Sequence, residues 1–341
     1  MEVGPVRWPR EGFPLARGDR RPFDTLPSDF REALQERLGA PVVRAISQVE
    51  GFSPGVAARL RLADGRRVFL KAVSARVNSD ARVIYRMEAN VARRLPTGVP
   101  APKLLWMVER GPWTALAFEE IPGRNPRLPW RHQDLARVLG ALEILGKKLT
   151  PAPFRAPIFA VAHRDAFRNW RTLPPPGRAS RKDLRGFGPW VRDHVGELTE
   201  AESRWERASR GRTLLHVDVR ADNVLLTDRE VYFVDWPWAA VGARWLDLLI
   251  FLPSVAMQGG PPPWKVFDSH PLSRRAHESD VDAVLAAVVG YFLFRGRLPQ
   301  IVTLPGIRAF QWAQGLEALR WLHHRWEGRD PGRPTDRSRT I

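Results

Sequence analysis

The stretch His216-Val-Asp-Val-Arg-Ala-Asp-Asn223 places a carboxylate, Asp218, and a carboxamide, Asn223, on what reads as one short loop. The apolar run Val-Tyr-Phe-Val at 231–234 follows and predicts a buried strand that delivers Asp235 to the same place. Phosphoryl transfer needs a carboxylate to orient a hydroxyl and accept its proton, and oxygen ligands for Mg²⁺. We therefore predict Asp218 as the catalytic residue, and Asn223 and Asp235 as the metal ligands.

The bulk composition is that of a globular protein. The chain has 341 residues, of which 44% are hydrophobic, so it can form one large or two ordinary domains with a substantial core. It contains no Cys, which excludes disulfide bonds, thiolate zinc sites and cysteine nucleophiles. This is typical of a reducing compartment, and we expect the protein in the cytoplasm.

We expect neither a secretory signal nor association with a membrane. Met1–Pro27 alternates Arg, Pro and Gly and has no apolar segment of the kind that signal peptides contain. The longest apolar run, Ala283–Phe294, is too short to cross a bilayer and ends at a charged residue. It is better interpreted as a core helix.

The formal net charge is +17, and the excess is carried mostly by Arg residues spread along the whole chain. A nucleic-acid-binding protein typically gathers its basic residues on one face or in one run. We therefore predict a solvated basic surface with no nucleic-acid partner. The alternative, a basic nucleic-acid-binding protein, predicts an affinity for DNA or RNA that falls steeply as the salt concentration rises.

The first half of the chain has the pattern of a small antiparallel sheet. Short apolar runs bounded by turn residues predict five strands, at Val42–Val49, Ala57–Leu62, Arg67–Val73, Lys103–Glu109 and Thr114–Glu119. Asp64-Gly65 and Gly111-Pro112 supply turns between neighbouring strands. Helical spacing predicts one helix inserted among the strands, at Ser79–Arg94, and a short helix before them, at Ser28–Leu38.

After Gly123 the pattern changes to helical spacing. It predicts long helices at Gln133–Leu149, Trp190–Trp205, Ser279–Arg295 and Pro305–Trp326, and Pro174–Gly177 reads as a surface loop. We predict an α+β fold of two lobes, a small antiparallel β lobe with one main helix and a larger, mostly α-helical lobe. The predicted divisions are a flexible N-terminal extension (1–25), a nucleotide-binding N-lobe (26–121), a C-lobe with the catalytic loop and acceptor site (122–328), and a disordered tail (329–341).

Two charged residues of the predicted N-lobe fit a nucleotide site. Lys71 lies on a predicted strand, and Glu88 lies in the middle of the helix that follows. A strand lysine neutralises the α- and β-phosphates of a nucleotide when a helix carboxylate holds its ammonium group. Each residue alone is typical of a solvated surface, but their order before the catalytic loop favours the functional interpretation.

The remaining nucleotide contacts are predicted from position in the chain. The turn Glu50–Gly55 lies between the first two strands, where Gly51, Ser53 and Gly55 would let backbone N–H groups approach a phosphate. Turns between strands contain Gly for other reasons as well, so this motif is weak. Glu119 and Ile121 precede the predicted hinge, where backbone groups would pair with adenine.

Taken together, these residues resemble the aminoglycoside phosphotransferase family, whose fold is related to that of the protein kinases. The resemblance covers about residues 40–325 and rests on Lys71, Glu88, Val-Pro-Ala-Pro (99–102), Phe-Glu-Glu-Ile-Pro-Gly (118–123), His216–Asn223, Asp235-Trp236 and Gly242–Leu248. It implies ATP (or GTP) in a cleft between two lobes, Mg²⁺ held by Asn223 and Asp235, and a small-molecule hydroxyl as acceptor. It also implies that Asp218 is the base or the residue that orients the hydroxyl.

The chain departs from the family pattern at two places. Val217 stands where Gly is common, which bears on the backbone path of the loop. No Asp-Phe-Gly or Ala-Pro-Glu segment follows Asp235, which counts against a protein substrate. Arg220 follows Asp218 closely, and it would face either the phosphate or the acceptor.

Other charged residues near these motifs have structural interpretations. His216 is predicted to hold the loop by hydrogen bonds, Asp222 to face solvent, and Asp247 to brace the catalytic loop. Glu278, Asp280 and Asp282 open a predicted helix, where carboxylates complement the helix dipole. The alternative for these three is a cationic acceptor, which would need carboxylates in the helical lobe.

We predict an ATP-dependent phosphotransferase that moves the γ-phosphoryl group directly to a hydroxyl of a small molecule. The acceptor stays open among aminoglycoside-like antibiotics, amino alcohols and sugars, and so does the oligomeric state. The alternative from another class is a catalytically silent nucleotide-binding protein. Its mark would be the loss of one functional residue, whereas all five are present: Lys71, Glu88, Asp218, Asn223 and Asp235.

Overall fold

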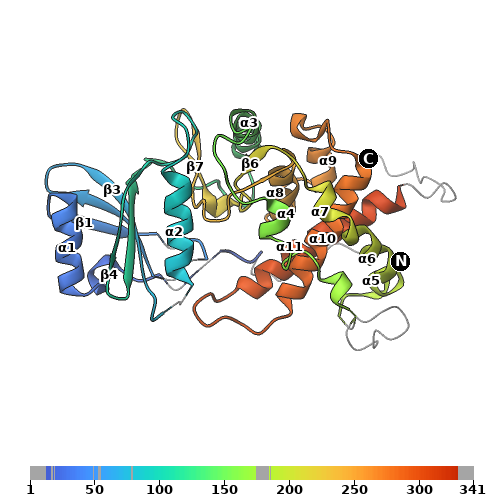
Figure 1. Ribbon diagram of the computed structural model, residues 1–341, viewed down its shortest axis with the longest axis horizontal. Coiled ribbons are helices and arrows are strands. Elements are labelled where there is room, and N and C mark those ends of the chain that lie inside the picture. The colour runs from blue at the N-terminus through green and yellow to red at the C-terminus, as the bar shows by residue number, and fades with distance from the viewer. Residues whose placement is uncertain are drawn as a thin grey trace.

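The computed structural model describes residues 13–16, 18, 20–48, 50–52, 55–77, 80–173, 184 and 186–328. Several sequence predictions therefore lie outside the described residues: the first part of the N-terminal extension, Ser53, the loop at 174–177 and the tail at 329–341. The described chain forms two lobes, a sheet with two helices and a larger body of helices (Figure 1). This is the predicted α+β architecture.

The N-lobe is built on one antiparallel sheet of five strands in the order β1-β2-β3-β5-β4. The strands are β1 (Val42–Ser47), β2 (Val56–Leu62), β3 (Arg67–Ser74), β4 (Leu104–Arg110) and β5 (Trp113–Glu119). Each lies within about two residues of its predicted position. The strand β3 is central, so side chains on either of its faces are covered by the lobe.

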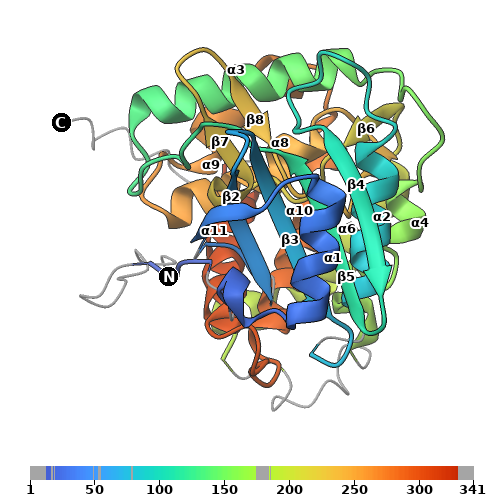
Figure 2. The same cartoon turned by 90° about the vertical axis from the view of Figure 1, so that its left-hand side faces the viewer.

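A helix covers each face of this sheet (Figures 1 and 2). The helix α1 (Ser28–Leu38) packs Phe30, Leu34 and Leu38 against one face. These three residues recur at intervals of four, the spacing of one helix face. The helix α2 (Ala81–Ala92) packs Tyr85 and Ala89 against the other face, on the side of the C-lobe.

The described part of the N-terminal extension is packed, in contrast to the predicted flexible segment 1–25. The backbone N–H of Gly51 donates to Ala16 O at 3.0 Å, and that of Arg21 donates to Gly55 O at 3.0 Å. The short helix η1 (Phe23–Thr25) buries Phe23 against the core of α1 and the sheet. The chain thus crosses the turn between β1 and β2 because backbone hydrogen bonds and one aromatic side chain hold it there.

The C-lobe is organised around the apolar helix α8 (Leu246–Met257), which is buried on nearly all sides. The other long helices are α3 (His132–Lys148), α10 (Glu278–Gly296) and α11 (Ile307–Glu327), and α10 packs along α11. Shorter helices are α4 (Phe159–Ala162), α5 (Pro189–Asp193), α6 (Val195–Ser203), α7 (Trp205–Ala208), α9 (Pro263–Phe267), η2 (Trp170–Thr172), η3 (Ala221–Asn223) and η4 (Pro271–Ser273). Two antiparallel pairs complete the lobe: β6 (Thr213–Leu215) with β9 (Ala240–Gly242), and β7 (Val224–Leu226) with β8 (Val231–Phe233).

One helix prediction in this lobe is wrong. The sequence predicts a continuous helix at Trp190–Trp205, but the chain forms α5, α6 and α7 instead. His194 (φ −108°, ψ 13°) leaves the helical region at the first break, and Arg204 (φ −98°, ψ −7°) stays within it but deviates from ideal helical dihedrals at the second. The apolar residues keep a helical spacing across the two breaks because α5, α6 and α7 all bury the side that faces the core of the lobe.

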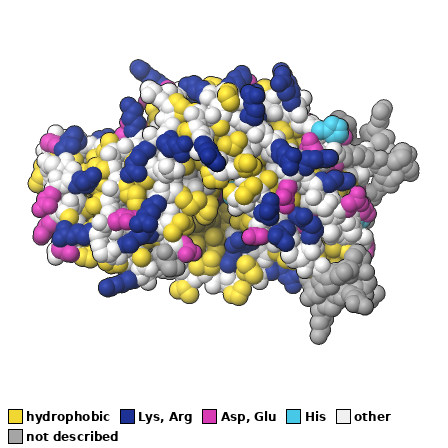
Figure 3. All heavy atoms as spheres, viewed as in Figure 1, with side chains coloured by type: hydrophobic (Ala, Val, Ile, Leu, Met, Phe, Trp, Pro, Cys, Tyr) yellow, Lys and Arg dark blue, Asp and Glu magenta, His cyan; other side chains and the backbone are white. Residues whose placement is uncertain are grey.

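Two predictions from composition can be followed in the fold. Ala283–Phe294 lies inside α10 and is largely buried, as expected of a core helix. In the part of the chain that the structure describes, no helix combines the length and apolar character that a membrane span requires. Lys and Arg side chains are scattered over the face seen in Figure 3 and form no single patch there.

Gly55 is predicted to be essential to the turn between β1 and β2. Its φ is +101°, and a Cβ atom there would lie 2.5 Å from Ala72 O, whereas a Cβ at Gly65 (φ +87°) would meet nothing within 4 Å. Gly55→Ala and Gly65→Ala both carry the strain of a positive φ, but only the first adds a backbone clash. We expect Gly55→Ala to lower the free energy of unfolding by about 1–3 kcal/mol more than Gly65→Ala in urea titrations. Equal losses in the two variants would contradict the packing described for Gly55.

Candidate active site

Two of the cavities where the lobes meet contain residues that the sequence singled out. The smaller, of about 240 Å³, is lined by residues of both lobes that include Lys71 and Asn223. The larger, of about 580 Å³, lies mainly in the C-lobe and includes Asp218. Asp235 lines both cavities, so the two spaces meet at this carboxylate.

The catalytic loop and the β7–β8 pair bring together the three residues that the sequence singled out. Asn223 Nδ2 donates to Asp218 O at 2.8 Å and to Asp218 Oδ2 at 3.1 Å. The backbone N–H of Val234 donates to Asn223 O at 3.0 Å, which fixes the residue before Asp235 against the loop. Because the amide nitrogen of Asn223 is used in this way, its oxygen is free to face the smaller cavity.

Lys71 joins the lobes through a buried pair of ionic contacts. Its Nζ lies 2.7 Å from Glu88 Oε2 on α2 and 2.9 Å from Asp235 Oδ1 in the C-lobe. Burial alone would lower the pKa of Lys71, but the two carboxylates outweigh burial and raise this pKa above its ordinary value. The lysine is therefore positively charged at any physiological pH.

The two carboxylates around Lys71 have opposite pKa shifts. Burial raises the pKa of Glu88 to about 7, although Lys71 opposes this shift. Burial also acts on Asp235, but the nearby Lys71 outweighs it and lowers the pKa of this carboxyl group. Asp235 is therefore ionised at neutral pH, as a metal ligand must be.

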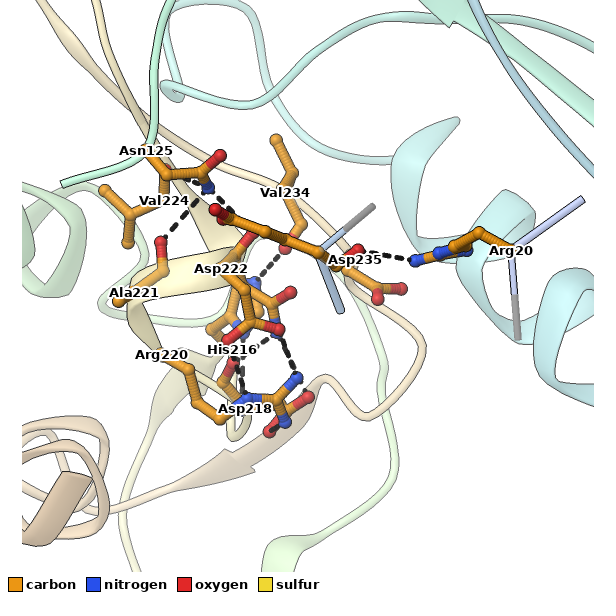
Figure 4. A network of polar contacts seen from close by, with 12 residues as sticks. Arg20, Asn125, His216, Asp218, Arg220, Ala221, Asp222, Val224, Val234 and Asp235 are labelled. Atoms are coloured by element: carbon orange, nitrogen blue, oxygen red, sulfur yellow. Dashed lines mark hydrogen bonds and ion pairs between the residues drawn. The ribbon is translucent and has the colours of Figure 1, made fainter. Parts of the chain in front are cut away.

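Arg220 clamps two carboxylates of the catalytic loop (Figure 4). Its Nη1 lies 2.5 Å from Asp218 Oδ1, and its Nη2 lies 2.8 Å from Asp222 Oδ2. Burial raises the pKa of Asp218 to about 6, while Arg220 limits the rise. The expectation that Asp222 faces solvent is wrong, because its side chain is only 5% exposed and is held by Arg220.

His216 and Asp247 hold the start of the loop. His216 Nδ1 accepts from the N–H of Asp218 at 3.3 Å, and Nε2 lies 2.9 Å from Val234 O. Burial lowers the pKa of His216 to about 4, so the ring is neutral and holds the loop by hydrogen bonds. Asp247 accepts the N–H groups of His216 and Val217 at 2.8 and 2.7 Å, and burial raises its pKa to about 6.

Backbone strain is concentrated in the same place. Val217 (φ 72°) and Asp235 (φ 67°) are the residues other than Gly with positive φ among those that the structure describes. A β-branched residue rarely adopts this conformation. Val217 occupies the position where the resemblance expects Gly, and the loop takes the left-handed turn there all the same, since Asp247 binds its N–H group.

The structure adds two residues that sequence reasoning did not find. Asn125 Nδ2 donates to the carbonyl groups of Ala221, Asp222 and Val224 at 3.0–3.2 Å, so it holds η3 from the hinge side (Figure 4). Arg20 reaches the smaller cavity from the N-terminal segment and points toward Asp235. No motif marks either residue, because each acts on a segment far away in the sequence.

The other predicted nucleotide contacts are distributed unevenly. Gly51, Glu119 and Ile121 line the smaller cavity. Gly55 does not line it, since this residue packs against Ala72 of β3, and Ser53 lies outside the described residues. The cavity also has apolar walls, formed by Ala57, Phe69, Phe118, Leu225 and Val234.

The donor set at the junction of the cavities suits a magnesium ion. Asn223 and Asp235 supply a carboxamide oxygen and an ionised carboxylate, which are the hard oxygen ligands that Mg²⁺ prefers. Two protein ligands are typical of magnesium bound together with substrate phosphates. Over the described residues, no cluster of three or more His, Asp or Glu side chains is arranged to hold a metal ion.

Comparison with known families gives one match that covers most of the chain. The model of a family described as the phosphotransferase enzyme family matches residues 48–278. A search of curated proteins finds no match to the sequence.

Solved structures of aminoglycoside phosphotransferases and choline kinases are among those with a similar fold. A thermostable mutant of aminoglycoside phosphotransferase APH(4)-Ia, in ternary complex with ADP and hygromycin B, matches with a TM-score of 0.56 at 16% identity, over 86% of this chain and 98% of that chain. Choline kinase from Cryptosporidium parvum Iowa II matches with a TM-score of 0.51 at 11% identity, over 88% and 95% of the two chains. A choline/ethanolamine kinase family protein from Mesorhizobium loti matches with a TM-score of 0.50 at 16% identity, over 88% and 99%. These likenesses confirm the predicted protein-kinase-like fold.

Asp247 is predicted to stabilise the catalytic loop. Asp247→Ala would leave two backbone N–H groups without their acceptor, and each such donor costs about 1–3 kcal/mol when buried. We expect the free energy of unfolding to fall by about 2–6 kcal/mol in urea titrations. Asp228→Ala, at an exposed position in the β7–β8 turn, is the control and should change it by less than about 0.5 kcal/mol. Similar values for the two variants would contradict the bracing role of Asp247.

Proposed function

This chain belongs to the phosphotransferase enzyme family and is a small-molecule kinase, and we propose that it takes the γ-phosphoryl group of ATP or GTP. The observation that carries the proposal is the position of Asp235, which lines both cavities. A nucleotide in the smaller cavity would present its phosphates where a hydroxyl compound in the larger cavity can reach them. The related fold has been solved with ADP and with AMP-PNP bound, which supports a nucleotide as donor.

The smaller cavity is suited to a nucleoside. Its apolar walls, which include Phe69, Phe118 and Leu225, would cover the two faces of a purine ring. Glu119 and Ile121 belong to the segment that joins the lobes, and their backbone groups would pair with the edge of the base. We propose that this segment, up to Gly123, is the hinge between a nucleotide-binding N-lobe and an acceptor-binding C-lobe.

Charged groups in the same cavity are suited to the phosphates. Lys71, fixed by Glu88, would neutralise the α- and β-phosphates as a point charge. Arg20 would add a second positive charge, because its guanidinium group lies near Asp222 and Asp235. The N–H of Gly51 is already used by Ala16, so the glycine turn would shape the cavity mainly by its path.

Asn223 and Asp235 would hold Mg²⁺, which when bound offsets the negative charge of the phosphates during transfer. Asp218 would orient the acceptor hydroxyl and take its proton as the oxygen–phosphorus bond forms. The proton on this hydroxyl moves to Asp218, and the nucleoside diphosphate leaves with the electron pair of the broken bond. No covalent intermediate on the protein is part of the proposal.

Arg220 would act beside the base. Its guanidinium group contacts Asp218 and Asp222, and Arg220 also lines the larger cavity. A planar guanidinium group binds phosphate oxygens in pairs, so Arg220 would contact the phosphoryl group during its transfer. A cytoplasmic location, where ATP and Mg²⁺ are abundant, is part of the same proposal.

The first test identifies the acceptor and the role of Asp218 together. An acceptor screen by mass spectrometry should find a compound that gains one phosphoryl group only when ATP and Mg²⁺ are both present. With that acceptor, Asp218→Asn should lower kcat by about 10²–10⁴-fold, because general-base assistance in the transition state is lost. The Kd for ATP, measured by calorimetry, should change little.

Asp228→Asn is the matched control, because it removes a carboxylate from an exposed turn of the same lobe. It should keep the kcat of the unchanged protein. Near-normal turnover of Asp218→Asn would refute the assignment of the base. Binding of ATP without transfer to any compound of a broad panel would favour the alternative, a catalytically silent nucleotide-binding protein.

The pH profile provides an independent test. Burial raises the pKa of Asp218 to about 6, and only the deprotonated carboxylate can accept a proton. We therefore expect kcat/KM to rise with pH through about 6 and to level off above about 7. A profile that is flat between about pH 5 and 8 would contradict a role for Asp218 as the base.

A further inference from the structure

The walls of the larger cavity are mainly aromatic and aliphatic. Phe167, Trp238, Tyr291, Phe292, Ile307 and Phe310 line it. They come from the segment after α4, from the loop after Asp235 and from α10 and α11. Such walls favour the burial of hydrocarbon surface, which stabilises a complex in proportion to the area removed from water. Hydrophobic side chains also surround the hollow in the middle of the face shown in Figure 3.

Carboxylates on these walls are few, and each is already matched by a cation. Among the described residues that line the cavity, Asp165, Asp218 and Asp235 are the acidic ones. Asp218 contacts Arg220, and Asp235 contacts Lys71. Asp165 contacts Arg168 in solvent, where its side chain is 94% exposed. None of the three is a buried carboxylate in need of an ammonium group.

The basic residues on the walls also give no reason to expect a polycationic acceptor. Arg220 and Arg295 both line the cavity, and Arg295 lies over the ring of Tyr291 with its Cζ 5.3 Å from the ring centre. Burial lowers the pKa of His163, so this lining residue is neutral at pH 7. Arg220 is already paired with Asp218 and Asp222, so an acceptor with several ammonium groups would meet hydrocarbon walls, the charge of Arg295 and carboxylates that are already paired.

The acidic cluster that was considered as a binding site for a cationic acceptor lies outside the larger cavity. Glu278, Asp280 and Asp282 are at the N-terminal end of α10, and none of them lines the cavity. A rise of 1.5 Å per residue places Asp282 about 13 Å from Tyr291 along the helix. Asp282 Oδ1 also lies 2.5 Å from Arg325 Nε of α11, so its charge is used between helices.

From these four observations we infer that the acceptor is a largely hydrocarbon compound that carries a hydroxyl group and no cluster of positive charges. This inference rests on the proposed function, the transfer of a phosphoryl group to a hydroxyl. The apolar body of the acceptor lies against the aromatic side chains of α10 and α11, and its hydroxyl group reaches Asp218. The inference therefore separates this chain from enzymes whose acceptors are polycationic.

A binding experiment tests the inference without requiring turnover. Calorimetry on the full chain with ADP and Mg²⁺ would compare two neutral diols, estradiol and 1,12-dodecanediol, with the polycation kanamycin. We expect the Kd of the better diol to be at least about tenfold below that of kanamycin, because the walls match hydrocarbon and their buried carboxylates are already paired with cations. Kanamycin binding as tight as either diol, or no binding of either diol, would overturn the inference.

The same samples distinguish this inference from the proposed function. Mass spectrometry with ATP in place of ADP reports whether a bound diol gains a phosphoryl group. A diol that binds and is phosphorylated supports both. A diol that binds and is never phosphorylated supports the cavity preference and counts against transfer to that hydroxyl. Phosphorylation of kanamycin with a higher kcat/KM than any diol overturns the inference and leaves the proposed function standing.

A charge placed in the cavity should shift the preference. Gln314 of α11 is buried and lines the cavity, so Gln314→Glu adds a carboxylate there with almost no change in shape. We expect the diols to bind at least about fivefold more weakly and kanamycin to bind more tightly than to the unchanged protein. Gln133→Glu, at an exposed position of α3, adds the same charge outside the cavity and should leave both Kd values within about twofold. Equal effects of the two variants would contradict the placement of the acceptor.

Discussion

The site depends on one buried lysine. Lys71 on the central strand β3 contacts Glu88 of α2, the next element in the chain, and Asp235 of the C-lobe, so a single ammonium group fixes two elements of the N-lobe to a distant segment. Removing such a group from water is costly, and only close opposite charges make its burial tolerable. Burial raises the pKa of Glu88 to about 7, so this carboxyl group is only partly ionised at neutral pH, and Asp235 is the fully ionised partner of Lys71. Asp235 also lies where the two cavities meet, which is where Mg²⁺ would bind under the proposed function.

The catalytic loop shows how the surrounding structure maintains a strained conformation. Val217 and Asp235 both have positive φ, at a cost of order 1–3 kcal/mol for each residue. Asp247 binds the backbone on either side of the first turn, and Asn125 binds three carbonyl groups on the far side of the loop. Both side chains act on backbone atoms, so they can hold the loop whichever side chains it carries. This explains how Val217 is accommodated where Gly would adopt the turn without strain.

The sequence predicted most of what depends on local pattern, apart from the helix at Trp190–Trp205, and missed several contacts between distant segments. Alternating apolar residues and the Asp64-Gly65 turn located the strands of the sheet, and the spacing of Phe30, Leu34 and Leu38 located α1. The order of charged residues along the chain predicted the group that converges on Asp235. Arg20 and Asn125 were not predicted because the residues near them in the site, Asp222 and Asp235 for Arg20 and the segment 221–224 for Asn125, lie about 200 and about 100 residues away, and no local pattern marks them. Asp222 was wrongly predicted to face solvent for a related reason, since its buried side chain is held by Arg220.

The contact between Arg220 and Asp218 lowers the basicity of this carboxylate. A carboxylate already engaged by a guanidinium group attracts a proton less strongly than a free one in the same buried place. A water molecule beside a bound nucleotide would therefore lie next to an Asp218 carboxylate of lowered basicity. Under the proposed function, an acceptor that displaces Arg220 from Asp218 would raise the basicity of this carboxylate, whereas a water molecule that leaves the pair intact would not.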